Sequence, residues 1–255
     1  ANAVNIQPLP WSSEAIWAAV QPLWPDFSVE VLAEIDSTNS ELMRRARDGL
    51  TPPTLLVAQA QTAGRGRLGR HWSSAPLASL TCSLGVALQP ADWSGLSLVV
   101  GVALAESLHA DIQLKWPNDL WLHGRKLGGI LVETASLGAQ RYAVVGFGIN
   151  IEAQPAADFS TAPAALRELT PSATPGSALQ AVALPLVQAL RQFEAQGFAP
   201  FAPRFAARDA LRGRTVRLSD GREGLCQGVG SSGALLVHTS LGVQAVTSSE
   251  VSVRP

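Results

Sequence analysis

Residues 64 to 88 read GRGRLGRHWSSAPLASLTCSLGVAL, a glycine- and arginine-rich segment followed by an alternating apolar pattern. From Ala78 to Leu88 apolar side chains occupy every second position, and the positions between them carry only Ser, Thr, Gly and Ala. A period of two predicts a half-buried β-strand. The small side chains leave room for a ligand, so we interpret that face as the wall of a pocket. A solvent-facing strand is the alternative, although it would more usually carry charged or longer polar groups.

The segment before this strand, residues 64 to 72, predicts an anion-binding loop. Its three glycines alternate with Arg65, Arg67 and Arg70, and no acidic residue occurs between Asp48 and Asp92. Glycine lets a backbone come close to a ligand, and arginine offers paired donors to carboxylate or phosphate oxygens. A flexible basic surface loop is the alternative. The spacing also fits the dinucleotide-binding fingerprint, but that motif requires a helix after its last glycine, and here a strand follows.

Length and composition limit the class of protein. The 255 residues are 47% hydrophobic and 15% charged, with a net charge of −1, which is enough chain for one large domain and a small one. The net charge implies no overall attraction to nucleic acid or to a membrane. Cys82 and Cys226 lie too far apart to suggest a small disulfide-stabilised scaffold. The longest apolar segment, 96 to 108, is too short to cross a bilayer. We therefore expect a cytoplasmic protein without a membrane partner.

The order of the elements predicts an α+β fold with a mixed, largely antiparallel sheet flanked by helices. Short strands between residues 113 and 134 are joined by tight turns, which is typical of hairpins and unlike a doubly wound sheet. Strands are expected at 29–35, 55–61, 78–88, 113–116, 120–122, 127–134 and 142–151. Helices are expected at 13–20, from about 40 to 48, and at 93–109, 177–196 and 199–207, with Pro185 kinking or splitting the fourth.

The composition changes after Gly213, and five short strands separated by Gly, Ser and Asp turns predict a small barrel. These strands are expected at 215–218, 223–229, 234–238, 243–247 and 251–254. The predicted divisions are a short N-terminal helical segment (1–27), a main domain (28–211) and a C-terminal domain (212–255). Residues 1–27 hold one helix where a winged helix-turn-helix needs three, so no DNA partner is expected.

Several polar residues stand at positions that suit a ligand. Among the basic residues only Lys115 and Lys126 are lysines, and lysine supplies a compact, movable ammonium. Gly146, Gly148 and Asn150 share one face of a strand, where a flat ring could lie on bare backbone and be read by the amide. Close packing of a helix onto these glycines is the alternative.

Four blocks of sequence together resemble the biotin protein ligases, also called biotin holocarboxylase synthetases. They are DSTN at 36–39, GRGRLGRHW at 64–72, KWPND at 115–119 with RKLGGILVE at 125–133, and GFGIN at 146–150. The resemblance covers nearly the whole chain. It implies a catalytic domain like that of class II aminoacyl-tRNA synthetases, followed by a small SH3-like β-barrel.

The resemblance also implies a two-step reaction with ATP, Mg²⁺ bound with the ATP, and biotin as substrate. Biotin is first activated as biotinyl-5'-AMP and then transferred to a lysine of a biotin carboxyl carrier domain, by a protein that is a monomer or a homodimer. A carboxylate and a phosphate repel each other by about 4 kcal/mol per unit pair at about 4 Å and an effective dielectric near 20. Cations must offset this repulsion.

Site residues follow from the resemblance by position. Lys115, Arg65 and Arg67 are the expected catalytic residues, no protein residue is assigned to metal, and Asn118 and Asp119 are expected only to shape the turn. Alone, the Ser, Thr and Asn at 37–39 also fit ordinary helix caps. The expected biotin-binding residues are Ser37, Thr38, Asn39, Gln61, Arg65, Gly66, Arg67 and Lys115. The expected ATP-binding residues are Arg67, Arg70, Trp72, Lys126 and Asn150.

Two other functions are compatible with the sequence. A lipoate or octanoyl ligase or transferase has a related fold, although its expected arginine-rich, triple-glycine block is absent. A non-catalytic ligand-binding module would suit the basic loop and the barrel.

Overall fold

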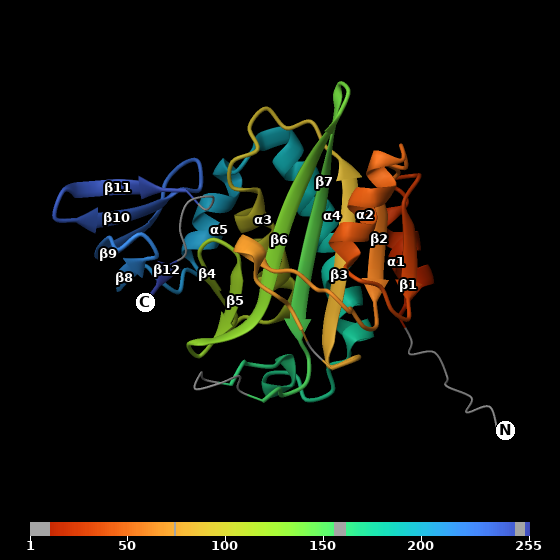
Figure 1. Ribbon diagram of the computed structural model, residues 1–255, viewed down its shortest axis with the longest axis horizontal. Helices are drawn as coiled ribbons and strands as arrows, with labels where there is room; N and C mark the ends of the chain where they lie inside the picture. Colours follow the sequence, from red (N-terminus) through yellow and green to blue (C-terminus); the bar gives the residue numbers. More distant parts are fainter. Residues whose placement is uncertain (1–10, 74, 156–161, 248–252) are drawn as a thin grey trace.

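The computed structural model describes residues 11–73, 75–155, 162–247 and 253–255, and its centre is a seven-stranded sheet (Figure 1). The strand order is β1-β2-β3-β7-β6-β5-β4. β1 is parallel to β2 and every other neighbouring pair is antiparallel, so the predicted mixed, largely antiparallel sheet is confirmed. The strands are β1 (Ser28–Leu32), β2 (Thr54–Ala58), β3 (Ser79–Ala87), β4 (Gln113–Lys115), β5 (Asp119–Leu122), β6 (Arg125–Leu137) and β7 (Gln140–Asn150).

Helices cover the two faces of this sheet unequally. On one face, α1 (Ser13–Val20), α3 (Leu96–Leu108) and α4 (Pro175–Gln196) enclose the main apolar core. α3 is apolar on nearly all sides because it is buried between α4 and the sheet. On the other face, α2 (Thr38–Arg47) covers part of β2, β3 and β7 over a small second cluster that includes Leu42 and Tyr142. The rest of that face is left for the site.

α4 shows how local signals and packing compete. Thr174 caps it, with reciprocal hydrogen bonds to Ser177, and Pro175 occupies the first turn, so the helix begins two residues before the predicted start. Pro185 lies within it without dividing it, so the predicted split at this residue is wrong. One missing hydrogen bond is tolerated because the helix buries a long apolar face that includes Val182, Leu186 and Leu190.

The C-terminal residues form a second, five-stranded antiparallel sheet, in the order β11-β10-β9-β8-β12. The indole of Trp116, just after β4, donates to the Gly233 carbonyl of this sheet at 2.9 Å. Gly233 also lies beside Gly95 and Leu98 at the start of α3. The SH3-like classification stays a prediction, and part of the last expected strand lies outside the described residues. The strands are β8 (Thr215–Leu218), β9 (Glu223–Val229), β10 (Leu235–Thr239), β11 (Gly242–Val246) and β12 (Val253–Arg254). Three short 3-10 segments, η1 (Arg67–Gly69), η2 (Leu166–Glu168) and η3 (Ala199–Phe201), and helix α5 (Ala202–Ala206) are the remaining elements of the described residues.

The register across β3, β7 and β6 explains why one face of the sheet is hollow. Thr81 pairs with Gly148, which pairs with Gly129. One row further along the strands, Ser83 pairs with Gly146, which pairs with Leu131. Small residues therefore stand side by side on the central strands.

No helix within the described residues is long and apolar enough to cross a membrane.

Gly85 continues this row of small residues beneath α2. The ring of Tyr142 fills the space that a side chain at position 85 would occupy. A Cβ at this position would lie 1.9 Å from the Tyr142 Oη and 2.8 Å from its Cζ. Because both residues are in the core, we expect Gly85→Ala to lower the free energy of unfolding by about 2 kcal/mol, measured by urea denaturation.

Two controls sharpen this test. Gly230→Ala meets only ordinary contacts, the nearest at 3.7 Å, and should change stability little. Tyr142→Phe removes the atom that clashes most, so the loss caused by Gly85→Ala should be smaller in that background. Equal losses in both backgrounds would contradict the packing argument.

Candidate active site

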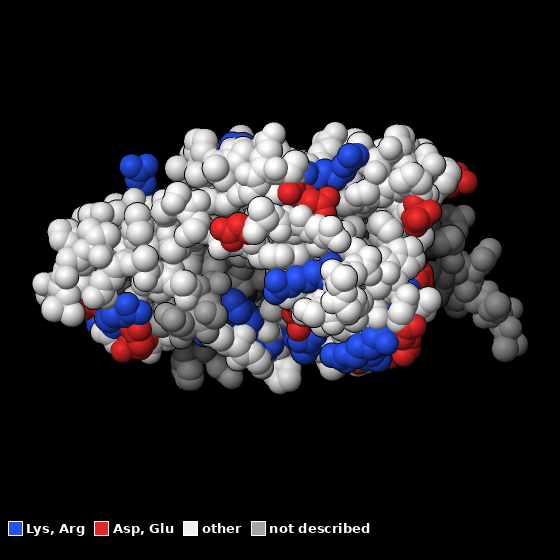
Figure 2. Space-filling view, turned by 90° about the horizontal axis from the view of Figure 1, so that it is seen from above, with Lys and Arg blue, Asp and Glu red and all other residues white. Residues whose placement is uncertain are grey.

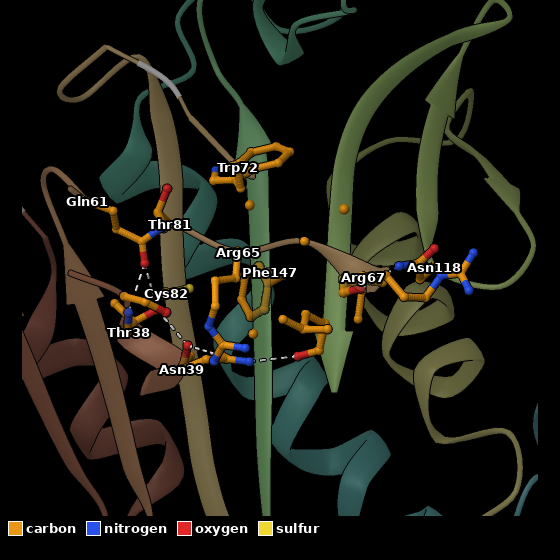
Figure 3. A pocket seen from close by; sticks show the side chains of 18 of the residues that line it. Thr38, Asn39, Gln61, Arg65, Arg67, Trp72, Thr81, Cys82, Asn118 and Phe147 are labelled. Atoms are coloured by element: carbon orange, nitrogen blue, oxygen red, sulfur yellow. Dashed lines mark hydrogen bonds between the residues drawn. The ribbon is translucent and has the colours of Figure 1, made fainter. Parts of the chain in front are cut away.

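A cavity that opens to solvent lies on the α2 face of the large sheet, with about 480 Å³ of space in and above it (Figure 3). The small-residue rows form its floor, with Thr81, Ser83, Gly146, Gly148 and Gly129 all lining it. The interpretation of the alternating strand as a pocket wall is thus confirmed. The structure also brings most of the predicted site residues to this cavity. They are Ser37, Thr38, Asn39, Gln61, Arg65, Gly66, Arg67, Trp72 and Lys126.

The start of α2 places three of these residues. The Ser37 hydroxyl caps the helix by accepting from the Ser40 amide at 3.2 Å, so the expected capping role is real. Thr38 and Asn39, in the first turn, point into the floor, and both are less than 5% exposed. This segment therefore caps the start of α2 and also supplies polar groups to the cavity.

These polar groups are hydrogen-bonded to one another. The Thr38 amide donates to Gln61 Oε1 at 2.8 Å, and the Thr38 hydroxyl lies 2.6 Å from that of Ser83. The Ser83 hydroxyl in turn donates to Asn39 Oδ1. Figure 3 shows Thr38, Asn39 and Gln61 grouped on one side of the cavity, away from Arg67 and Asn118 on the other. At one end of the cavity the floor is therefore polar, and its side chains are fixed by hydrogen bonds to one another.

The bare backbone of β7 is occupied by the protein's own side chains. A Cβ at Gly146 would lie 2.1 Å from Asn39 Oδ1, and a Cβ at Gly148 would lie 2.4 Å from the Trp72 ring. A flat ring does lie on the strand, but it is the indole of Trp72 and not a ligand. Close packing of a helix, the alternative interpretation, holds at Gly146 because Asn39 belongs to α2.

The loop of residues 64 to 72 passes over the cavity and is tied to itself and to the sheet. The Gly66 amide donates to the Arg70 carbonyl at 2.6 Å, and the Trp72 amide donates to the Gly64 carbonyl at 2.9 Å. The Arg65 guanidinium binds Glu133 on β6, with Nη2 2.8 Å from Oε1 and Nη1 3.2 Å from Oε2. Glu133 belongs to a quoted block but carried no predicted role, since one acidic residue in a strand gives no signal in sequence.

A group of cations surrounds one carboxylate at the other end of the cavity. Lys126 Nζ lies 3.4 Å from Asp119 Oδ1, and Lys115 is the register partner of Asp119 across β4 and β5. Burial lowers the pKa of Arg67 and that of Lys115 from their ordinary values, while the Asp119 carboxylate opposes both shifts. Arg70 lowers both pKa values further. Cations outnumber acids here, as an anionic ligand requires.

Figure 2 shows basic side chains gathered near the middle of one long face of the molecule, with acidic ones between them. The Lys126 ammonium also lies 5.7 Å from the Trp72 ring, and that of Lys115 lies 5.1 Å from the Trp121 ring. Both lysines of the chain are therefore held beside aromatic faces. Within the described residues, no cluster of three or more His, Cys, Asp or Glu could hold a metal ion.

Three predicted site residues do not line the cavity. Lys115 lies next to it, behind Asn118 and Asp119, and Arg70 is exposed on the loop. Asn150 is buried one row beyond Gly148, where its amide donates to the Ala164 carbonyl at 3.1 Å and accepts from Ser79. The adenine contact of Asn150 stays a prediction. Asn118 was expected only to shape the turn, but it lines the cavity as well, and its side chain donates to the Ile130 carbonyl on β6 at 2.7 Å.

Comparison with known proteins agrees with this geometry. A model of the biotin/lipoate A/B protein ligase family matches residues 31–150. The biotin--[acetyl-CoA-carboxylase] ligase of Paracoccus denitrificans is 34% identical over 241 residues, which cover 87% of this chain and 98% of that protein. The chain belongs to the biotin/lipoate A/B protein ligase family.

Two further matches extend this assignment. The bifunctional ligase/repressor BirA of Escherichia coli (strain K12) is 36% identical over 239 residues, or 89% of this chain and 74% of that protein. The structure of the biotin protein ligase from Aquifex aeolicus in complex with biotin and ATP superposes with a TM-score of 0.75 at 29% identity, covering 89% of this chain and 98% of that one. The resemblance to biotin protein ligases, the α+β fold and the assignment as a ligase are confirmed. The roles of single residues in this family member stay predictions.

The pair of Arg65 and Glu133 makes a testable electrostatic prediction. Burial opposes the ionisation of Glu133, but hydrogen bonds from Arg65 and Asn39 outweigh it, so the pKa lies below the ordinary value of 4.5. We expect an NMR titration of this carboxyl to show the lowered pKa and Arg65→Met to raise it, because burial then meets less opposition. Arg47→Met, which removes a more distant cation, should move it much less.

The same pair should affect stability in a defined pH window. Because the pKa is lower in the folded state, the ionised carboxylate stabilises the fold above its unfolded pKa and loses that contribution as the pH falls through its folded pKa. Arg65→Met should therefore lower the free energy of unfolding more at about pH 7 than at about pH 3. A Glu133 that titrates at its ordinary value in the wild-type protein would contradict the ion pair.

Proposed function

We propose that this chain activates biotin with ATP, forming biotinyl-5'-AMP and pyrophosphate, and then transfers the biotinyl group to a lysine of a biotin carboxyl carrier protein. The observation that carries this proposal is the two-ended cavity. One end is a hydrogen-bonded polar floor, the other is a cluster of cations, and an arginine-bearing loop passes over both. Family membership and relatives named as biotin ligases support the same reaction.

The two ends of the cavity suit the two ends of biotin. The bicyclic urea has N–H donors and a carbonyl acceptor, which match the hydroxyl and amide groups of Thr38 and Gln61. The valerate carboxylate then extends toward Arg67 and Lys126, which line the far end. An apolar octanoyl chain or a lipoyl dithiolane would offer no hydrogen bond to the Thr38 hydroxyl or to the Gln61 amide while displacing water from them, which is unfavourable. The polar floor therefore favours biotin over these substrates.

The cations serve the first step of the reaction. A biotin carboxylate oxygen attacks the α-phosphorus of ATP, a P–O bond forms, and the bond to pyrophosphate breaks. Negative charge gathers between two groups that repel each other, and we assign Lys115, Arg65 and Arg67 to offset it, because preorganised cations in a partly buried site stabilise such charge strongly. ATP brings Mg²⁺, which neutralises part of the phosphate charge.

In the second step, the amine of the carrier lysine attacks the activated carbonyl carbon. The C–O bond to AMP breaks, the amide forms, and the amine releases a proton. The Trp72 ring lies on Gly148 beside the cavity, and we assign it and Asn150 to the adenine side, with Arg70 and Lys126 near the phosphates. The same cations stabilise the departing AMP phosphate.

Location and assembly belong to the proposal as well. We place the protein in the cytoplasm, which the two buried, unpaired thiols of Cys82 and Cys226 support. We expect it to act there on its carrier as a monomer or a homodimer.

Incubation with biotin, ATP and Mg²⁺ tests the activity. We expect biotinyl-5'-AMP by mass spectrometry and pyrophosphate in equal amount, and transfer to a carrier domain when one is added. Lipoate and octanoate serve as matched substrates and should give no comparable product. Adenylation of lipoate in place of biotin, or biotin binding without pyrophosphate release, would overturn the assignment.

Lys115→Arg tests the role of the ammonium. It keeps the charge but exchanges a compact group for a planar one beside Asp119 and Trp121, so we expect adenylation to fall by about 100-fold with the Kd for biotin changed little. Arg217→Lys, a change of similar size at an exposed position, is the control. Wild-type turnover in Lys115→Arg would remove Lys115 from the reaction.

A further inference from the structure

A continuous hydrogen-bond chain runs beneath the cavity from the loop to the floor. Glu133 Oε1 accepts from Arg65 at 2.8 Å and from Asn39 Nδ2 at 3.0 Å. Asn39 Oδ1 accepts from Ser83, whose hydroxyl lies 2.6 Å from that of Thr38. Asn39, Ser83 and Thr38 are 4%, 0% and 3% exposed, so water does not compete for these bonds.

Donor and acceptor chemistry fixes the direction of every bond in this chain. An ionised carboxylate and a backbone carbonyl can only accept. Asn39 therefore uses both amide hydrogens, one to Glu133 and one to the Leu131 carbonyl at 3.1 Å, and its oxygen must face Ser83. Ser83 has a single hydrogen, which it donates to Asn39, so the short contact between Ser83 and Thr38 requires Thr38 to donate.

Thr38 is the member of this hydrogen-bond chain that faces the ligand. Its hydroxyl hydrogen is used by Ser83, since the competing contact with Gln61 Oε1 is longer, at 3.4 Å. Its oxygen then presents only lone pairs to the cavity. Gln61 Oε1 already accepts from the Thr38 amide, which directs the Gln61 Nε2 donors elsewhere. An acceptor and a donor side by side are complementary to the N–H and C=O of a cyclic urea.

We propose that Glu133 is a positioning residue that sets the direction of this chain, so that Thr38 is held as an acceptor for an N–H of the bound urea. This inference rests on the proposed function for its ligand. Without the carboxylate, only the Leu131 carbonyl still holds the direction of the Asn39 amide, so the hydroxyls of Ser83 and Thr38 are fixed less firmly. The glycine at 146 gives Asn39 its place, because a Cβ there would lie 2.1 Å from its oxygen.

The rival explanation is that Glu133 acts only by holding Arg65 over the cavity. The two roles predict different ligand dependence. Arg65 acts on the carboxylate of biotin, whereas the floor acts on the urea, which biotin methyl ester retains. A role in the floor weakens binding of both molecules, and a role through Arg65 weakens binding of biotin alone.

Calorimetric Kd values for biotin and biotin methyl ester test the proposal. We expect Glu133→Gln and Ser83→Ala each to raise both Kd values about 10-fold, the effect of about one charge-assisted hydrogen bond. Arg65→Met should raise the Kd for biotin more than that for the ester. Glu30→Gln, which weakens a similar pair between Glu30 on β1 and Arg45 on α2, is the matched control and should change neither.

The double variant decides whether Glu133 acts through Ser83. The two residues share Asn39 as a partner, so Glu133→Gln combined with Ser83→Ala should raise the Kd about 10-fold, as each single variant does, and not about 100-fold. Should Ser83→Ala fail to fold, Thr38→Val combined with Glu133→Gln gives the same comparison at the end of the chain.

Each outcome has one meaning. Additive effects, or a Glu133→Gln variant that weakens biotin but not its ester, overturn the inference and leave the proposed function standing. A wild-type protein that binds neither molecule overturns the proposed function, and the assignment of the urea with it.

Discussion

The hollow on one face of the sheet depends on small or missing side chains at the centre of three adjacent strands, β3, β7 and β6. Gly129, Gly146 and Gly148 share a face with Thr81 and Ser83, so the backbone there can be approached closely from above. The helix residue Asn39 and the loop residue Trp72 use this access, and each lies where a single Cβ would exclude it. The opposite face of the same strands carries the main core under α3 and α4. One sheet thus serves as a stable wall on one side and as an open floor on the other.

Charge is distributed within the site in a way that suits its proposed chemistry. Glu133 binds Arg65 at the loop, and Asp119 binds Lys126 at the far end. These acids hold Arg65 and Lys126 in position, and the Asp119 carboxylate also acts on the charges of Arg67 and Lys115. Cations still outnumber acids at the site, and Arg67 and Lys115 are partly buried, where a charge interacts more strongly with an anion than it would in water. A ligand that brings a carboxylate and a triphosphate together would meet this charge.

Much of the fold follows from local pattern. The helix at 13–20 begins and ends at the predicted residues, and the strands of the main sheet lie within a few residues of their predicted ranges. These elements could be predicted because periodicity, caps and turn residues act over a few positions. At Pro185 the sequence left a kinked helix and a split helix as alternatives, because the choice between them depends on apolar packing against α1 and α3. The partners of Gly146 and Gly148 could not be predicted either, because a glycine in a strand does not indicate which group fills the space above it.

The order of the residues is enough to give the chemical groups of the site and their sequence along the chain. Glycine freedom, arginine geometry and strand alternation are properties of the residues and hold wherever the chain goes. Only the tertiary structure decided that Glu133 meets Arg65 and Asn39, from positions 68 and 94 residues away along the chain. That meeting depends on strand register and on the angle of α2 over the sheet, which are set by the packing of the whole core and not by any short stretch of residues.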